Sequence, residues 1–339
     1  MEEKIISKEA FRDFLAGLTG KYQVFAPVRS ESSIAFEEID SGDEILFDYF
    51  NTKTSIKDFF FPQRERLFSF NLIKPEEIGE PDLSDRKRII FGLRPCDAKG
   101  LSLLDSIFDD KDYQDPYYLT KRGDTIVISM GCNQPAGTCF CTSLGGDPFS
   151  DDGSDLFLVD MGDFLLARPV TEKGEALIKE ETGFKKVDED QSRIKEKIIE
   201  DARASIKSDV NPEKVKEKLD ANFDDAIWDK LHEKCLGCGI CTFLCPTCHC
   251  FDILDETGGS KGERIRIWDS CMFPQFTLHA SGANPRPTGR ERVRQRVMHK
   301  FKYLVDNTGK TGCTGCGRCI IYCPVNLDIR EILREIENQ

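Results

Sequence analysis

The sequence predicts an α/β domain at the N-terminal end, followed by a mostly α-helical, cysteine-rich domain. In residues 1–170, short runs of β-branched and aromatic residues alternate with stretches of helical spacing. Residues 222–339 contain two cysteine-rich repeats, each accompanied by apolar residues at helical spacing. The length of 339 residues exceeds that of an average single domain, which is about 150 residues. We therefore expect two domains, residues 1–170 and 222–339, joined by residues 171–221.

Five apolar runs are expected as strands of the α/β domain, at residues 22–28, 88–93, 125–130, 156–159 and 164–167. Residues 98–108 follow a helical pattern, and Asp97 is expected to cap that helix. Cys96 and Cys132 each lie just beyond a strand. Because open α/β sheets bind ligands at the carboxyl ends of their strands, both cysteines are expected at a ligand-binding edge.

Residues 171–221 are dense in Lys and Glu, and the pair Asn211-Pro212 interrupts their helical pattern. The apolar positions at helical spacing are Ile194, Ile198, Ile199, Ala202 and Ile206. Charge alternation of this kind is ordinary on exposed helices. The segment therefore predicts a charged helical connector that needs no binding role of its own.

Charge is distributed unevenly along the chain, whose net charge is −13. Residues 234–339 hold 15 Lys and Arg against 11 Asp and Glu, whereas residues 1–233 hold 32 against 49. An acidic majority argues against a nucleic-acid-binding surface over the whole molecule. No apolar run approaches the roughly 18 residues of a spanning helix, and the start, MEEKIISKEA, lacks the pattern of a signal peptide. A cytoplasmic protein without membrane insertion is expected.

The cysteines carry the strongest functional signal, because there are 15 of them and the odd number argues against a disulfide framework. CLGCGICTFLCP (residues 235–246) and CTGCGRCIIYCP (residues 313–324) share the spacing C-x2-C-x2-C-x3-C-P. This run holds a 4Fe-4S cluster in bacterial two-cluster ferredoxins, where the fourth cysteine ligates the other cluster. One centre would then use Cys235, Cys238, Cys241 and Cys323, and the other Cys313, Cys316, Cys319 and Cys245. Structural zinc is the alternative, but it uses pairs of thiolates rather than two triplets with a trailing cysteine.

The two repeats are joined by a longer segment than in a small ferredoxin, with 67 residues between Cys245 and Cys313. Helical spacing precedes the second repeat and also follows it. The apolar residues on these faces are Val293, Val297, Phe301, Leu304, Ile329, Ile332 and Ile336. The pattern favours a helical two-cluster ferredoxin domain over the small β-hairpin type.

A basic segment, residues 286–302, lies between the repeats and contains one acid, Glu291. Its cations are Arg286, Arg290, Arg292, Arg294, Arg296, Lys300 and Lys302. A nucleic-acid patch is one interpretation, although no base-stacking aromatics are interleaved. Compensation of the anionic clusters is a second, because nearby cations raise a cluster's potential. A solvated helix face is the third.

Four further cysteines lie in the α/β domain, namely Cys96, Cys132, Cys139 and Cys141. Cys96 and Cys132 follow strands, and the segment GCNQPAGTCFC carries Cys139 and Cys141 as well as Cys132, so the four could converge on a third 4Fe-4S cluster. Their spacing is not diagnostic, so zinc and ordinary buried thiols remain alternatives.

The remaining cysteines, Cys248, Cys250 and Cys271, are interpreted as packing residues, with a further site including His249 as the alternative. The four histidines form no metal-spaced pair. Neither G-x-G-x-x-G nor a P-loop is present, so no nucleotide site is visible.

Six segments taken in order resemble one known family: GLRPCDAKGL, GCNQPAGTCFCTSLGG, CLGCGICTFLCPTCHCFDI, RIWDSC, HKFKY and CTGCGRCIIYCPVNLDI. They are similar to the iron–sulfur β subunits of sulfhydrogenases, to the corresponding iron–sulfur subunit of anaerobic sulfite reductase, and to subunits that link NADH-oxidising flavoproteins to heterodisulfide reductases. The resemblance spans roughly residues 89–330, and residues 1–85 carry no motif that matches. It implies an electron-transfer subunit of an anaerobic complex and strengthens the expectation of a third cluster.

Two functions remain open at this stage. In the first, the chain has no catalytic residues of its own and relays electrons between two partner subunits, one an FAD/NAD(P)-binding reductase and the other catalytic. In the second, the chain is an enzyme that reduces a disulfide or sulfur compound at a cluster in the α/β domain. The paired Cys-Cys-Gly segments that resemble the catalytic subunit of heterodisulfide reductases are missing from the sequence, which favours the relay.

Overall fold

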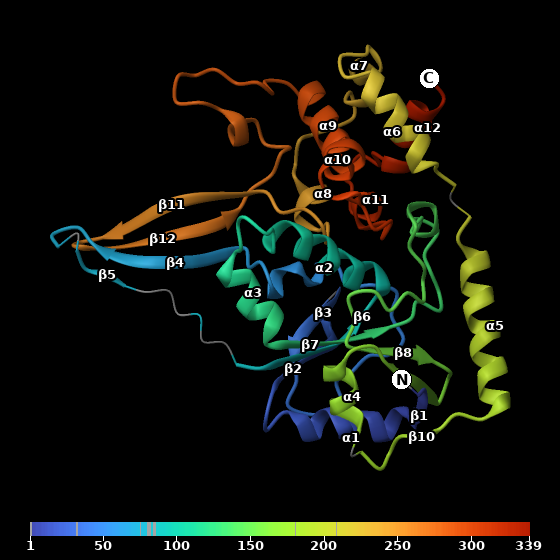
Figure 1. The fold of residues 1–339 in the computed structure, drawn as a ribbon. Helices are drawn as coiled ribbons and strands as arrows, with labels where there is room; N and C mark the ends of the chain where they lie inside the picture. The colour runs from blue at the N-terminus through green and yellow to red at the C-terminus, as the bar shows by residue number, and fades with distance from the viewer. Residues whose placement is uncertain are drawn as a thin grey trace.

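The computed structural model describes residues 2–31, 33–74, 76–79, 83, 86–179, 181–207 and 209–339. An eight-stranded sheet forms the base of the molecule, and a second sheet of four strands extends away from it. The helices of the C-terminal third lie on the opposite side of the molecule from the N-terminal helix (Figure 1).

The large sheet has a parallel centre and antiparallel edges. Its strand order is β10-β1-β9-β8-β7-β6-β2-β3, in which β2, β6, β7 and β8 run parallel. The strands are β1 Lys4–Ser7, β2 Gln23–Ser30, β3 Ser33–Glu38, β6 Arg88–Leu93, β7 Thr125–Met130, β8 Leu156–Asp160, β9 Phe164–Pro169 and β10 Lys185–Lys186. The predicted strands at residues 88–93 and 125–130 are confirmed with these bounds.

Helices cover both faces of the large sheet, because its central strands are apolar on both sides. Ile89 and Phe91 of β6 pack with Phe11, whereas Ile90 packs with Leu101 on the opposite face. The first face is covered by α1 Lys8–Leu18 and α4 Glu172–Ile178, and the second by α2 Pro95–Phe108 and α3 Pro116–Gly123. The predicted α/β architecture is therefore confirmed for the N-terminal part.

Helix α2 begins before Asp97, so Asp97 is not its N-cap. The N-cap is Arg94, and Pro95 occupies the first turn, where its missing N–H costs no hydrogen bond. Asp97 lies inside the helix and is fully buried, so its predicted role as a cap is wrong.

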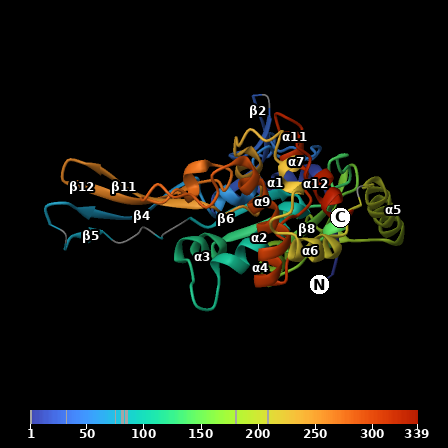
Figure 2. The same ribbon diagram turned by 90° about the horizontal axis from the view of Figure 1, so that it is seen from above.

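The second sheet combines strands from distant parts of the sequence. Its order is β11-β12-β4-β5, and every neighbouring pair is antiparallel. The strands are β4 Arg64–Asn71, β5 Ile78–Gly79, β11 Phe251–Gly258 and β12 Lys261–Trp268. Figures 1 and 2 both show this sheet as an arm that projects from the body. The hairpin β11–β12 lies between the two repeats, so the expectation of a mostly helical second domain is not confirmed.

The remaining helices follow the large sheet in the sequence and are short, except for α5, which has 17 residues. They are α5 Glu189–Ser205, α6 Pro212–Ala221, α7 Ile227–Leu231, α8 Ile240–Phe243, α9 Gly289–Met298, α10 Leu304–Thr308, α11 Arg318–Ile321 and α12 Ile329–Glu337. A π-helical turn, η4 His299–Tyr303, continues α9, and the 3-10 turns are η1 Ile56–Phe59, η2 Thr142–Leu144 and η3 Pro274–Thr277. Ile332 and Ile336 of α12 pack with Val297 and Phe301, as the helical spacing predicts.

The α/β part and the C-terminal helices share buried side chains. Phe140 and Leu144, from the loop after β7, belong to the same core as Phe301 and Ile332. Within residues 171–221, α4 covers the large sheet, whereas α6 packs on α12. The predicted domain boundaries therefore stay a prediction. Within the described ranges, no helix is both long and apolar enough to cross a membrane.

Candidate metal centres

The two cysteine repeats fold into the same local structure. Gly239 and Gly317 have φ values of +75° and +74°, and each is the N-cap of a one-turn helix, α8 or α11. A side chain is disfavoured in this left-handed conformation, which explains glycine at the same place in both repeats. The turn places the third cysteine of each repeat, Cys241 or Cys319, in the first turn of its helix.

The first group consists of Cys235, Cys238, Cys241 and Cys323. All four line one apolar cavity of about 50 Å³. Three of them come from the first repeat and Cys323 is the last cysteine of the second, whereas Cys245 is not among the residues that line the cavity. The structure therefore brings together the four residues expected for a crossed ligand set.

The middle group consists of Cys245, Cys313, Cys316 and Cys319. Burial raises the pKa of Cys313 to about 11, and the charges of Cys245 and Cys316 act in the same direction. Burial also raises the pKa of Cys319, with contributions from the other three members. The four thiols therefore lie close enough to disfavour one another's ionisation, and a bound metal would stabilise their thiolate forms.

The N-terminal group consists of Cys96, Cys132, Cys139 and Cys141. They line a cavity of about 20 Å³ where β6 and β7 end, which is the edge predicted for a ligand. Burial raises the pKa of Cys139 to about 12 and that of Cys141 to about 11. Asn51 Nδ2 lies 3.7 Å from Cys96 Sγ, within reach of a weak hydrogen bond.

The middle group lies between the other two groups. Cys319 lines the cavity of the first group, and Cys316 lines the cavity of the N-terminal group. The second repeat also packs directly on the N-terminal loop, where Phe140 N donates to Gly315 O at 3.0 Å. A Cβ atom added at Gly315 would lie 2.5 Å from the backbone N of Cys141, so only glycine permits this contact.

A buried ion pair joins the two cysteine-bearing regions and was not predicted from the sequence. Arg318 of α11 is 1% exposed and makes two hydrogen bonds of 2.7 Å to the carboxylate of Asp97, which is 0% exposed. Arg318 also donates to the backbone oxygen of Thr52 at 2.9 Å and to Asn51 Oδ1. No local pattern could indicate the pair, because 221 residues separate its partners.

Two cations of the basic segment are buried beside the cysteines, and Lys57, from η1, is buried near Cys248. Arg296 is 8% exposed and lines the cavity of the first group, and Lys300 is 3% exposed. Lys300 Nζ donates to Cys245 Sγ at 3.3 Å, to Thr247 Oγ1 at 2.9 Å and to Gly312 O at 2.7 Å. Burial alone would lower the pKa of Lys300, but the charges of Cys245, Cys248 and Cys313 raise it.

These cations test whether the site fits an anionic cluster. In the part of the chain that the structure describes, Arg296 Nε has no hydrogen-bond partner, and neither Arg296 nor Lys300 forms an ion pair with a carboxylate. A buried charge without a counter-charge is costly. A 4Fe-4S core with four thiolates is a net anion, so the residues present fit such a group.

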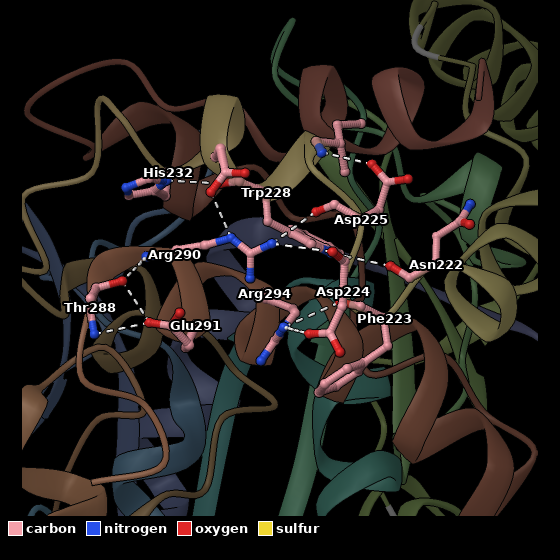
Figure 3. A network of polar contacts seen from close by, with 12 residues as sticks. Asn222, Phe223, Asp224, Asp225, Trp228, His232, Thr288, Arg290, Glu291 and Arg294 are labelled. Carbon is pink, nitrogen blue, oxygen red and sulfur yellow. Dashed lines mark hydrogen bonds and ion pairs between the residues drawn. The ribbon is translucent and has the colours of Figure 1, made fainter.

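Three outer cations of residues 286–302, Arg290, Arg294 and Lys302, form ion pairs with carboxylates instead. Figure 3 shows Arg290 and Arg294 of α9 reaching the segment that precedes and includes α7. Arg290 pairs with Asp229 at 2.7 Å, and Arg294 pairs with Asp224 at 2.6 Å while its guanidinium stacks on Phe223. The basic segment therefore has outer cations that pair with carboxylates of the chain, and two buried cations, Arg296 and Lys300, beside the cysteines.

Of the three remaining cysteines, Cys248 lies beside Cys245 of the middle group, whereas Cys250 and Cys271 pack with Cys235 and Cys241 of the first group. A hydrogen bond between Cys245 and Cys248 lowers the pKa of Cys245, and one between Cys250 and Cys271 lowers the pKa of Cys250 to about 7. Burial lowers the pKa of His299, whose ring lies 5.4 Å from that of His249, to about 4.

Among the described residues, no set of three or more His, Cys, Asp or Glu side chains is arranged to hold a single metal ion. A zinc ion requires its ligands at about 2.3 Å from one point, whereas each thiolate of a cubane binds a different iron.

Comparison with known proteins supports clusters in the C-terminal part. A family described as a 4Fe-4S dicluster domain matches residues 234–327, which supports two clusters in the C-terminal part. The chain is 35% identical over 333 residues to sulfhydrogenase 2 subunit beta of Pyrococcus furiosus, covering 98% of this chain and 97% of that one. No solved structure matches the chain. The chain therefore belongs to the family of iron–sulfur β subunits of sulfhydrogenases.

Proposed function

We propose that the chain is the electron-transfer subunit of an anaerobic, cytoplasmic, multi-subunit oxidoreductase. It relays electrons between two partner subunits: an FAD/NAD(P)-binding reductase, and a catalytic partner of the hydrogenase, sulfite reductase or heterodisulfide reductase type. The observation that carries this proposal is the position of the middle group, which contributes Cys319 to the cavity of the first group and Cys316 to that of the N-terminal group. Three cofactors held in this order would form a continuous path for electrons.

The ligand sets in this proposal are the three groups described above. The first and middle groups hold one 4Fe-4S cluster each, and the N-terminal group holds a third. Each cluster supplies one-electron chemistry. The protein supplies burial, the thiolate ligands and the buried cations Arg296 and Lys300 that offset the negative charge.

One end of the path reaches the surface of the protein. Cys238 of the first group is exposed, and its neighbour Leu236 is 68% exposed. An exposed leucine beside a redox cysteine suits a protein partner, because apolar residues at a contact exclude water from it. We infer that one partner subunit docks over Leu236 and Cys238, and that the other docks at the N-terminal group.

One observation favours the enzyme alternative. A cavity of about 360 Å³ lies beside the N-terminal group, and the two cavities share Phe50 and Arg94. A volume of this size admits a small substrate. Arg94, however, already donates to Phe50 O at 3.0 Å and to Gly131 O at 2.6 Å, so its guanidinium is engaged with the backbone.

Iron analysis distinguishes the possible cofactor contents. Anaerobically purified protein is expected to contain about twelve iron atoms per chain, because all three groups bind clusters of four irons. Iron and acid-labile sulfide are measured together with zinc by elemental analysis. A content of about eight irons with one zinc would contradict the third cluster and would move Cys96, Cys132, Cys139 and Cys141 to a zinc site.

Crossed ligation predicts which signal a single substitution removes. The Cys245→Ala variant is expected to lose or convert the cluster of the middle group, because Cys245 lies with Cys313 rather than with its own triplet. The matched control is Cys323→Ala, which should affect the first group instead. Electron paramagnetic resonance spectra of the dithionite-reduced variants provide the measurement, and loss of the first-group signal in Cys245→Ala would show that each repeat closes its own cluster.

A further inference from the structure

The buried cations of the chain are unevenly placed among the three cysteine groups. Lys300 makes a direct hydrogen bond to a thiol of the middle group, at 3.3 Å from Cys245 Sγ. All three protons of its ammonium group have acceptors, since Thr247 Oγ1 and Gly312 O complete the set. A long side chain held by three hydrogen bonds keeps its charge fixed in position beside the sulfur.

Local backbone structure supports this placement. Lys300 lies in the π-helical turn η4, directly after α9. Turns of this type are rare in proteins, and many of those that occur lie at functional sites. Gly312, the acceptor at 2.7 Å, precedes the first cysteine of the second repeat, whereas Thr247 follows the last cysteine of the first. Lys300 therefore contacts both chain segments that deliver ligands to the middle group.

The other two groups lack an equivalent charge in the part of the chain that the structure describes. Arg94 faces Cys132 of the N-terminal group but is bound to backbone oxygens, and Arg318 is neutralised by Asp97 at 2.7 Å. Arg296 lies between the first and middle groups, where the charges of Cys241 and Cys319 act on it. Among the described residues, Lys300 is thus the cation that has no carboxylate partner and that donates a hydrogen bond to the sulfur of a ligand candidate, Cys245.

We propose that Lys300 raises the reduction potential of the middle centre above the potentials of the two outer centres. The inference rests on the proposed function and extends it by ordering the three centres. A fixed positive charge favours the more negative, reduced form of a neighbouring cluster. When a reductant supplies one electron to the chain, that electron therefore resides at the middle centre.

The test is a redox titration of the full-length protein with its clusters, followed by electron paramagnetic resonance under anaerobic conditions. In the parent protein the middle centre is expected to be reduced first, and its signal is assigned through the Cys319→Ser variant. Lys300→Met is expected to lower the reduced-to-oxidised ratio of that centre at a fixed potential by about tenfold or more, because a charge-assisted hydrogen bond is lost. A tenfold change in this ratio corresponds to a shift of about 59 mV for a one-electron couple.

Two variants separate this effect from a structural one. Lys302→Met removes a cation from the same turn, but Lys302 pairs with Asp306 at 3.1 Å on the exposed side, so no centre should shift. Lys300→Arg keeps the charge and should restore most of the ratio. An unchanged middle centre in Lys300→Met, an equal shift of all centres, or an outer centre that is reduced first in the parent would overturn the inference.

If Lys300→Met does not retain its clusters, the Thr247→Val variant tests the inference instead. This variant removes the hydroxyl that lies 2.9 Å from Lys300 Nζ and 3.2 Å from Cys245 Sγ, and a smaller drop confined to the middle centre is expected. No shift in Thr247→Val would overturn the inference. The proposed function has a separate test. It is contradicted if the protein lacks the expected iron or if its clusters cannot be reduced, whereas the order of the reduction potentials tests only the inference about Lys300.

Discussion

Replacing Arg318 by methionine is expected to lower the free energy of unfolding by about 3–5 kcal/mol, because it leaves a buried carboxylate without its partner. Asp97 is fully buried and accepts two hydrogen bonds of 2.7 Å from the guanidinium. Methionine fills much of the volume but supplies no donor. The same variant should weaken the contact between the second repeat and the N-terminal loop, so the signal of the N-terminal centre should be broadened or lost.

Anaerobic guanidinium titration followed by circular dichroism measures the change in stability. The matched control is Arg330→Met, which breaks a pair with Asp328 of the same length, 2.7 Å, at a more accessible site. About 1 kcal/mol or less is expected there. The double variant Arg318→Met with Asp97→Asn should recover part of the loss because no charge stays buried, and equal effects of the Arg318 and Arg330 substitutions would contradict this account.

In a complex with an NAD(P)H-oxidising flavoprotein, replacing Cys316 by serine is expected to abolish electron delivery to the far acceptor while flavin reduction continues. Cys316 belongs to the middle group and also lines the cavity of the N-terminal group, so it lies where the path has to pass. The measurement compares the rate of flavin bleaching with the rate of acceptor reduction in a stopped-flow experiment. The matched control is Cys250→Ser, a cysteine outside the three groups, which should leave both rates unchanged.

Activity assays on the isolated chain distinguish the relay function from the enzyme function. Dithionite should reduce its clusters, but no turnover with NAD(P)H, hydrogen, sulfite or disulfides is expected, because the sequence has no nucleotide-binding motif and no further catalytic group. The relay would be refuted if the chain alone reduced sulfite or a disulfide at a rate that disappeared when Cys96 or Cys139 was replaced. That result would assign the cavity of about 360 Å³ beside these residues as a substrate site.

Local patterns made a large part of this structure predictable. Strands β6 and β7 begin and end at the predicted residues because each is a short apolar run bounded by polar or turn residues. The shared cysteine spacing likewise predicted two equivalent repeats, since its constraints act within a few residues. The sequence also predicted helix α12, because one face of that helix is apolar throughout.

Features that depend on distant partners were missed or misread. Asp97 looks like a helix cap in sequence, but its carboxylate is bound by Arg318, 221 residues away. Strand β11 buries neither of its faces, and β4, the other neighbour of β12, belongs to the first part of the chain. Among the seven cations of residues 286–302, only packing reveals that Arg296 and Lys300 turn inward, since all seven have the same chemical signature in the sequence.

The four-stranded sheet combines strands from distant parts of the sequence, and this has a consequence for how the protein is made. Arg64 of β4 and Glu256 of β11, which form an ion pair in the finished sheet, are 192 residues apart, so β4 leaves the ribosome long before its neighbour β12 exists. Until synthesis nears its end, β4 has an unpaired edge. The loop that carries Cys316 is made later still, and it closes over Cys141. The side of the N-terminal loop that Gly315 covers is thus open until the second repeat has been made.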